Sequence, residues 1–324
     1  MNGNRILLTG ATGLIGSALV NRLAAEGAYL TCPVRDLTKV RDIFEESVIE
    51  SVNWVETSLE DYIANQDDSF DYVIHGASPT ASKFFVDKPV ETLLFNITTT
   101  TSLLEYARIH SVKGFAFLSS LESYGTVLDD TDAITEDVQG YVNPMEARSS
   151  YNMAKRTCES LCHAYAVEYN VPVKVVRLTQ TISPNISDDD MRVFAQFARH
   201  AANGEDIELH TEGTAARQYI HIDDAVEAIL CILHKGMSGE VYNAAREDSY
   251  ISVRDMAHFV QDNFNPSGKV TFRQRDDMGY APTTKLRLST EKLRGLRWEA
   301  KYGLYDMFDH LISRLKSSKD IQVK

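Results

Sequence analysis

The chain has 324 residues, of which 44% are hydrophobic, and this is enough to form a substantial core in one large α/β domain or in two unequal lobes. The 33 Lys and Arg residues are outnumbered by 46 Asp and Glu residues, so the formal net charge is −13, which argues against non-specific binding to nucleic acids. No apolar run approaches the roughly 18 residues of a membrane helix and the first residues lack a signal-peptide pattern, so we expect a cytoplasmic protein without a membrane partner.

Short β-rich runs alternate with amphipathic helical runs in the first half of the chain. The predicted strands cover residues 5–10, 28–34, 70–76, 114–120 and 171–178. The predicted helices cover residues 14–27, 89–110 and 149–169. Such alternation is typical of a parallel sheet that is covered by helices on both faces. The sequence therefore predicts an α/β protein with a Rossmann-type, doubly wound parallel sheet.

The pattern changes after about residue 178, where loops lengthen and helical runs at 193–204 and 253–264 are separated by irregular sequence. We therefore expect a dinucleotide-binding domain over residues 1–178 and a smaller substrate-binding lobe over residues 179–324. The segment 220–246 contains one helical and one strand-like run, and we expect it to return to the main sheet.

The sequence LLTGATGLIGSALV places Gly10, Gly13 and Gly16 between a predicted strand and a predicted helix. Glycines at such a turn let the backbone approach a pyrophosphate, whose negative charge is stabilised at the helix N-terminus. A glycine-rich turn without a ligand is the alternative. The order of strand, turn and helix favours dinucleotide binding.

Tyr151 is the one tyrosine of the chain that is followed by a lysine four residues later, Lys155. On a helix this spacing puts both side chains on one face. A free phenol has a pKa of about 10, and an adjacent ammonium group favours its ionised form. Lys155 is therefore expected to make Tyr151 usable as a general acid or base.

The two motifs TGxxGxxG and YxxxK together resemble the extended short-chain dehydrogenase/reductases, the NAD-dependent epimerase/dehydratase family, which acts mainly on nucleotide sugars. The segments HGASPTASKFFVDKPVETLLFN and VNPMEARSSYNMAKR are similar to UDP-glucuronate decarboxylases within that family. The resemblance implies a homodimer, and it implies that Ser120 hydrogen-bonds the sugar oxygen with which Tyr151 exchanges a proton. A serine at a strand end could instead simply cap the next turn.

The resemblance also assigns residues to the two ligands. The residues implied in cofactor binding are Gly10, Thr12, Gly13, Leu14, Ile15, Gly16, Arg35, Lys39, Ala77, Asn96, Tyr151 and Lys155. The residues implied in substrate binding are Ser120, Gln180, Arg192 and Arg217. Gln180 replaces an asparagine of the family, which keeps the amide but changes its reach. Either arginine could instead be a surface ion-pair partner.

The choice of cofactor depends on the end of the second predicted strand. NAD enzymes usually carry an acidic residue there, whereas this chain has Val34 followed by Arg35. This favours NADP over NAD, with Lys39 and Arg41 as candidates for further contacts to the phosphate. Asp36 is the residue that could instead bind the ribose of NAD.

Glu122 lies two residues after Ser120, where dehydratases and decarboxylases of this branch carry a glutamate that assists proton removal near sugar carbon 5. The alternative is a structural ion pair with a nearby arginine such as Arg148. The four cysteines and nine histidines lack the spacing of metal ligands, so no metal is expected.

Three functions remain open at this point. The first is a nucleotide-sugar enzyme that oxidises carbon 4 and then epimerises, dehydrates or decarboxylates. The second is an NADPH-dependent reductase of a nucleotide-linked keto sugar or ketose. The third is a non-catalytic, dinucleotide-sensing regulator, which the retained Tyr151 and Lys155 disfavour.

Overall fold

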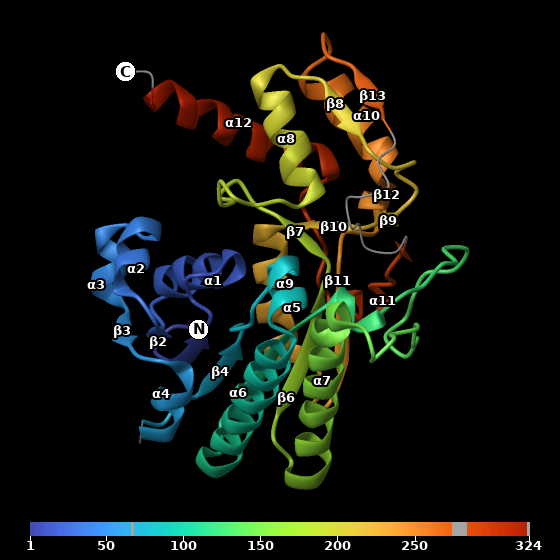
Figure 1. Ribbon diagram of the computed structural model, residues 1–324. Helices are drawn as coiled ribbons and strands as arrows, with labels where there is room; N and C mark the ends of the chain where they lie inside the picture. The colour runs from blue at the N-terminus through green and yellow to red at the C-terminus, as the bar shows by residue number, and fades with distance from the viewer. Residues whose placement is uncertain (66–67, 274–283, 323–324) are drawn as a thin grey trace.

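Seven parallel strands form the central sheet in the computed structural model, which describes residues 1–65, 68–273 and 284–322 (Figure 1). The strand order is β11-β6-β5-β4-β1-β2-β3. The strands are β1 Arg5–Thr9, β2 Tyr29–Val34, β3 Asn53–Glu56, β4 Tyr72–His75, β5 Gly114–Ser120, β6 Val173–Leu178 and β11 Val241–Ala244. This arrangement confirms the predicted fold class, an α/β protein with a doubly wound sheet.

The sequence did not predict the 19-residue helix α12 (Leu304–Gln322). Within residues 1–88, the elements that it failed to predict are all short. They are β3, α2 (Leu37–Ile43), α3 (Glu46–Ser51), α4 (Leu59–Asn65) and α5 (Ser82–Asp87). β3 has only four residues, with exposed ends and a half-buried middle, so it lacks the apolar run of the inner strands. None of the four helices buries more than two residues, and a periodic pattern cannot develop over so few positions.

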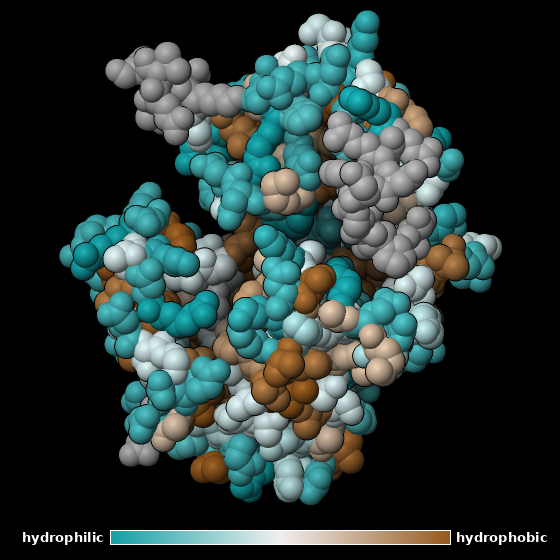
Figure 2. Space-filling model, viewed as in Figure 1, coloured by the Kyte–Doolittle hydropathy of each residue, from teal (hydrophilic) through white to brown (hydrophobic). Residues whose placement is uncertain are grey.

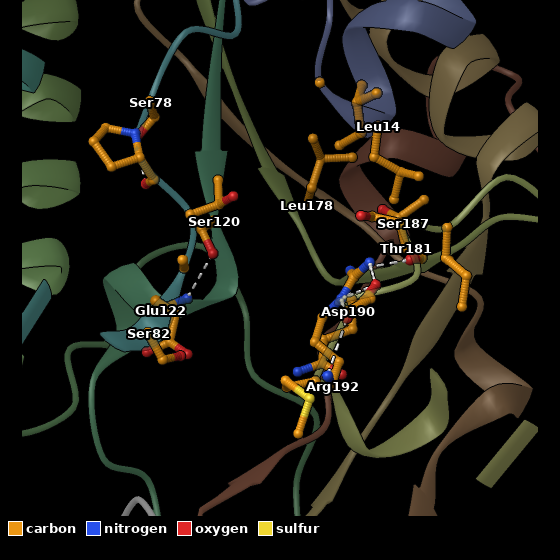
Figure 3. Close-up of a pocket in the computed structure, with 18 of the residues that line it drawn as sticks. Leu14, Ser78, Ser82, Ser120, Glu122, Leu178, Thr181, Ser187, Asp190 and Arg192 are labelled. Atoms are coloured by element: carbon orange, nitrogen blue, oxygen red, sulfur yellow. Dashed lines mark hydrogen bonds and ion pairs between the residues drawn. The ribbon is translucent and has the colours of Figure 1, made fainter. Parts of the chain in front are cut away.

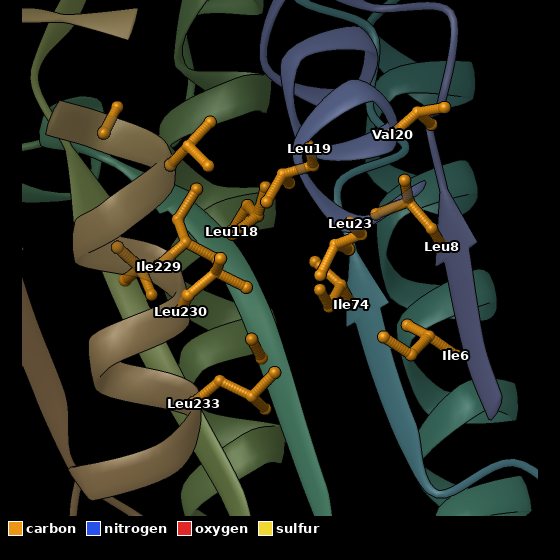
Figure 4. Packing of buried hydrophobic residues seen from close by; sticks show 14 of the residues in the cluster. Ile6, Leu8, Leu19, Val20, Leu23, Ile74, Leu118, Ile229, Leu230 and Leu233 are labelled. Carbon is orange, nitrogen blue, oxygen red and sulfur yellow. The ribbon is translucent and has the colours of Figure 1, made fainter. Parts of the chain in front are cut away.

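Helices cover both faces of the sheet, and alternate residues of each strand point to opposite layers. Ile6 and Leu8 of β1 pack under α1 (Leu14–Ala25) and α9 (Ile222–Lys235), as Figure 4 shows. Leu7 belongs to the other layer, which is formed with α4, α6 (Pro89–His110) and α7 (Ser150–Tyr169). Apolar side chains on both faces explain why the inner strands are almost continuously hydrophobic.

The C-terminal part packs around a separate core that includes Phe194, Met256, Met307 and Phe308. Its helices are α8 (Val193–Asn203), α10 (Val253–Phe264), α11 (Glu291–Arg294) and α12 (Leu304–Gln322). Its short strands are β7 Gln180–Ile182, β8 Ile207–Leu209, β9 Ala216–Arg217, β10 Tyr219–His221, β12 Ile251–Ser252, β13 Val270–Phe272 and β14 Lys285–Leu286. The strand β11 lies beside β6 in the main sheet. A domain boundary near residue 178 stays a prediction.

No helix within the described ranges combines the length and the apolar character that a membrane crossing requires.

A buried ion pair joins the carboxyl end of β6 to α7. Arg177 Nη2 lies 2.7 Å from Glu159 Oε2, and the two side chains are 7% and 8% exposed. Ser119 of β5 donates to Glu159 Oε1 at 2.5 Å, and the Arg177 guanidinium lies 4.5 Å from the ring centroid of Tyr124. Tyr124 ends the short 3₁₀ helix η1 (Leu121–Tyr124). The pair therefore anchors the turn that follows β5.

We predict that Arg177→Met lowers the free energy of unfolding by about 3–5 kcal/mol, because Glu159 would remain as an uncompensated buried charge. Lys88→Met is the matched control, since it breaks an exposed pair with Glu91 and should cost less than about 1 kcal/mol. Urea unfolding of both variants measures the difference. Equal losses would show that Arg177 contributes no more than a surface pair.

Candidate active site

One continuous cavity of about 3490 Å³ runs along the carboxyl ends of the main-sheet strands and extends under α8. Figure 2 shows the molecule hollowed between the part that holds α8 and α12 and the part that holds α1 to α3. A pocket for one small ligand typically measures about 300–1,000 Å³. The cavity therefore has room for a dinucleotide and a second ligand at the same time.

The turn between β1 and α1 forms one wall of the cavity. Gly10 has a φ of +77°, and a Cβ atom there would lie 2.7 Å from the backbone nitrogen of Ala77. A Cβ atom on Gly16 would lie 2.0 Å from Gly10 O. The cavity is lined by the last residues of the turn, Thr12 and Gly13, and by the first residues of α1, Leu14 and Ile15. Because α1 begins at Leu14, its free N–H groups lie at this wall, and the turn fits a dinucleotide pyrophosphate.

Arg35 and Lys39 line the cavity just beyond the end of β2. Among the described residues, neither forms an ion pair. Asp36, the residue that could have bound the ribose of NAD, caps α2 instead: its Oδ1 accepts from Thr38 N at 2.9 Å and from Thr38 Oγ1 at 2.5 Å. The two cations are therefore available to a ligand, while the carboxylate is occupied.

Tyr151 lies in α7 at the centre of the cavity wall, and its ring is only 6% exposed. It stacks on Phe85 of α5 with 4.3 Å between ring centroids. Burial raises the pKa of the Tyr151 hydroxyl and the charge of Glu122 raises it further, while Ser120, Arg148 and Ser78 lower it. Ser120 Oγ also accepts a hydrogen bond from Glu122 N at 3.2 Å (Figure 3).

Lys155 is 3% exposed, and its ammonium group donates to Leu118 O at 2.9 Å. The Nζ atom lies 5.6 Å from the centroid of the Tyr151 ring. Burial lowers the pKa of Lys155 to about 8. The sequence led us to expect that this lysine lowers the pKa of Tyr151, but burial of the phenol outweighs the nearby charges and raises that pKa.

The residues after β4 approach the same site. Ala77 lines the cavity, and its backbone nitrogen donates to Thr9 Oγ1 at 3.2 Å. Asn96 is only 1% exposed, and its amide is occupied by Ser78 Oγ at 2.8 Å and by Thr92 O at 2.7 Å. Asn96 is absent from the cavity wall but bonds Ser78, which lines it, and the cofactor contact expected for Asn96 stays a prediction.

Glu122 lines the cavity from η1 and is in contact with Arg148 and Asn152. Arg148 Nη2 lies 3.6 Å from Glu122 Oε1, so the predicted alternative of an ion pair is present. Asn152 was not singled out from the sequence, although it directly follows Tyr151. Its Nδ2 donates to Glu122 O at 2.6 Å and to Glu122 Oε2 at 3.2 Å.

Figure 3 shows Arg192 across the cavity from Ser120, and the other two predicted substrate contacts, Gln180 and Arg217, also line the cavity. Gln180 Oε1 is buried and has no hydrogen-bond partner among the described residues. Arg217 forms no ion pair within the same ranges. Arg192 pairs with Asp190, with 2.5 Å between Nη2 and Oδ2, and donates to Thr181 O at 3.3 Å. The predicted alternative of an ion pair thus holds for Arg192, but its partner lies in the cavity wall.

Residues 6–245 match the NAD dependent epimerase/dehydratase family. The chain belongs to this family. The family resemblance predicted from the sequence is thereby confirmed, and so is the predicted class of enzyme at the level of the family. The family description names a nicotinamide dinucleotide, NAD, which agrees with the cofactor class expected from the glycine-rich turn.

Two relatives and one solved structure are similar to this chain. UDP-glucuronic acid decarboxylase 1 of Xenopus tropicalis is 26% identical over 83% of this chain and 62% of its own length. UDP-glucuronic acid decarboxylase 4 of Arabidopsis thaliana is 28% identical over 93% of this chain and 66% of its own length. The chain thus spans less than two thirds of the length of these relatives. UDP-glucose 4-epimerase of Thermotoga maritima shares the fold, with a TM-score of 0.83 and 22% identity over 97% of this chain and 99% of that one.

In the part of the chain that the structure describes, no three His, Cys, Asp or Glu residues form a cluster that could hold a metal ion.

We compare the free energy of unfolding of the wild type with that of Lys155→Met. We predict that this difference shifts in favour of the wild type by about 3 kcal/mol between pH 7 and pH 10. The folded-state pKa of about 8 is below that of an unfolded lysine, so the unfolded chain binds more protons in this window and stability rises with pH. Below pH 8 the cost of the buried charge is fully present. Urea unfolding at both pH values measures the change, with Lys88→Met as the exposed control. An unchanged difference would contradict the low pKa.

Proposed function

We propose that this chain is a nucleotide-sugar enzyme that oxidises the sugar at carbon 4, alters the resulting keto sugar and then returns the hydride. The observation that carries this proposal is the single cavity that joins the dinucleotide turn, Tyr151 and the residues below α8. A dinucleotide that lies on the α1 turn would bring its nicotinamide end toward Tyr151, and a second ligand would extend from there toward Arg217.

The nicotinamide dinucleotide, when bound, accepts and returns the hydride of carbon 4. Tyr151 takes the hydroxyl proton as the hydride leaves, so that the alcohol becomes a ketone, and gives the proton back on reduction. Ser120, at the end of β5, hydrogen-bonds the same sugar oxygen. The ammonium group of Lys155 lies 5.6 Å from the centroid of the Tyr151 ring, and Lys155 would hold the ribose of the dinucleotide.

Glu122 distinguishes this proposal from simple hydride transfer. Its carboxylate lies at the cavity wall beside Tyr151 and is suited to remove a proton from the carbon next to the new ketone. The electron pair of that C–H bond then moves toward the carbonyl oxygen. The resulting enolate is the common intermediate of epimerisation and elimination next to a ketone.

The nucleotide diphosphate would bind below α8. Among the described residues, the amide oxygen of Gln180 has no hydrogen-bond partner and Arg217 has no ion pair, so the first can accept a hydrogen bond from the substrate and the second suits a phosphate. Arg192 keeps two N–H groups free beside its bonds to Asp190 and Thr181. These positive groups are local, as an acidic protein that binds an anionic ligand requires.

NADP is favoured over NAD within this proposal. Arg35 and Lys39 face the cavity at the position where the 2′-phosphate would lie, and Asp36 is committed to its helix cap. This observation also favours a second candidate function, an NADPH-dependent reductase of a nucleotide-linked keto sugar or ketose. A sensing regulator is disfavoured because Tyr151 and Lys155 keep their places at the cavity.

A homodimer through the helices α6 and α7 is expected from the family resemblance. It is supported by the exposed apolar residues Val90, Ile109 and Val167 on these helices.

The experiment that tests the proposal is incubation of the protein with a panel of nucleotide sugars, with and without added NADPH, followed by mass spectrometry. Conversion of a sugar without added NADPH supports the redox-neutral enzyme. Conversion only when NADPH is added, with a mass gain of two hydrogens, supports the reductase. No conversion of any nucleotide sugar or keto sugar would contradict both.

Tyr151→Phe should lower turnover of the converted sugar by roughly two to four orders of magnitude, because it removes the proton that balances hydride transfer. The ring remains and still stacks on Phe85, so dinucleotide binding, measured by fluorescence titration, should change little. Turnover close to that of the wild type would remove Tyr151 from the mechanism.

Arg35→Ala should weaken binding of NADPH by roughly 1.5–3 kcal/mol, the usual contribution of a charge-assisted hydrogen bond, and should leave NADH almost unchanged. Isothermal titration with both dinucleotides measures the difference. Arg41→Ala is the matched control, because Arg41 is a nearby arginine in α2, the helix that follows Arg35, but is absent from the cavity wall. Tighter binding of NADH by the wild type would reverse the assignment.

A further inference from the structure

Arg148 and Asn152 are four residues apart, at the junction of the 3₁₀ helix η2 (Ala147–Ser149) and α7. This spacing puts both side chains on one face of the helical segment, and both are in contact with Glu122. Each oxygen of the Glu122 carboxylate has its own partner: Oε1 lies 3.6 Å from Arg148 Nη2, and Oε2 accepts from Asn152 Nδ2 at 3.2 Å. Both ends of the carboxylate are thereby held.

Asn152 holds the backbone of Glu122 as well, because its Nδ2 also donates to Glu122 O at 2.6 Å. The backbone nitrogen of Glu122 donates to Ser120 Oγ at 3.2 Å. Main chain and side chain of Glu122 are therefore fixed relative to Ser120 and to the start of α7, where Tyr151 lies. A group held at three points loses little further conformational freedom when a substrate binds.

Arg148 is also linked to Tyr151 through the aromatic ring of Phe85. Its guanidinium carbon lies 5.2 Å from the centroid of Phe85, and Phe85 stacks on Tyr151 with an angle of 9° between the rings. The other amino group of the guanidinium, Nη1, is buried without a hydrogen-bond partner among the described residues. A buried donor without a partner is destabilising, so stability alone does not account for this placement.

We propose that Arg148 and Asn152 are positioning residues, which hold the Glu122 carboxylate beside Tyr151 for the proton removal that follows oxidation at carbon 4. This inference rests on the proposed function. It also unites the two interpretations of Glu122 that the sequence left open, because the ion pair is the means by which the carboxylate is held at the site.

Electrostatics supports the same arrangement. The charge of Glu122 disfavours ionisation of the Tyr151 hydroxyl, and the charge of Arg148 favours it. A carboxylate beside a proton-accepting phenol would hinder the first step if it stood alone. With Arg148 as its partner, both groups can lie at one cavity wall.

The test compares Arg148→Met, Arg148→Lys and Asn152→Asp with Glu122→Gln, using the sugar that the wild type converts. Rapid mixing with the oxidised dinucleotide follows the absorbance of its reduced form near 340 nm, and mass spectrometry follows the product. We expect Arg148→Met and Asn152→Asp to resemble Glu122→Gln: reduced dinucleotide accumulates, and product forms about 10–100-fold more slowly. Arg148→Lys should restore part of the product rate.

Two further comparisons separate positioning from a general loss of structure. The double variant Glu122→Gln/Arg148→Met should be no slower than Glu122→Gln alone, because both changes remove the same function. Arg108→Met, at an exposed pair on α6, is the matched control and should behave as the wild type. The inference is overturned if Arg148→Met partitions between reduced dinucleotide and product as the wild type does. It is also overturned if both steps slow in parallel with a loss of thermal stability that Arg148→Lys does not restore.

Failure of the proposed function gives a different result. In that case the wild type converts no sugar of the panel, or Glu122→Gln forms product at the wild-type rate. The crystal structure of Arg148→Met then decides the inference without a substrate. A Glu122 carboxylate that leaves its place beside Tyr151 supports the positioning role, and an unmoved carboxylate overturns it.

Discussion

The close contact between the β1–α1 turn and the loop after β4 is the constraint on which the site depends. Gly10 and Gly16 approach each other and the backbone at Gly76 and Ala77 so closely that a single Cβ atom would collide with main-chain atoms. This contact places the N-terminus of α1 at the carboxyl end of β1, which lies between β4 and β2. From β1 the chain continues to β2 and β3 on one side and to β4, β5 and β6 on the other. A crevice opens at such a switch point, and crevices of this kind hold ligands in open α/β sheets.

Tyr151 and Lys155 are placed at the cavity at the cost of burial. Tyr151 and Lys155 lie almost entirely out of water, and burial disfavours the charged form of each. Lys155 remains there because its ammonium group donates a hydrogen bond to Leu118 O and because the rings of Phe117 and Tyr151 face it. Such a pair is poorly suited to stability and well suited to proton transfer, since a lysine with a pKa of about 8 titrates near neutral pH.

The two sides of the cavity differ in how firmly their side chains are held. On the side of α7, Glu122 and Tyr151 are fixed by Asn152, Arg148 and Phe85. On the opposite side, Gln180 Oε1 has no hydrogen-bond partner and Arg217 has no ion pair within the described part of the chain. Fixed groups suit the reacting carbon atoms, where small displacements cost rate. Unpaired groups suit recognition of the remainder of the ligand, whose binding satisfies them.

The sequence by itself determined the parallel sheet, the dinucleotide turn and the pairing of Tyr151 with Lys155, because each depends on local spacing along one strand, turn or helix. It also indicated Ser120 and Glu122 together, since both follow one strand. Tertiary structure alone decided which partners these groups meet. Phe85 lies 66 residues from Tyr151 in the chain, and no local pattern shows that their rings stack. The hydrogen bonds that occupy the amide of Asn96 and those that fix Glu122 likewise come from helices and loops that pack against one another. Such contacts are set by distances in space, which the spacing of residues along the chain does not reveal.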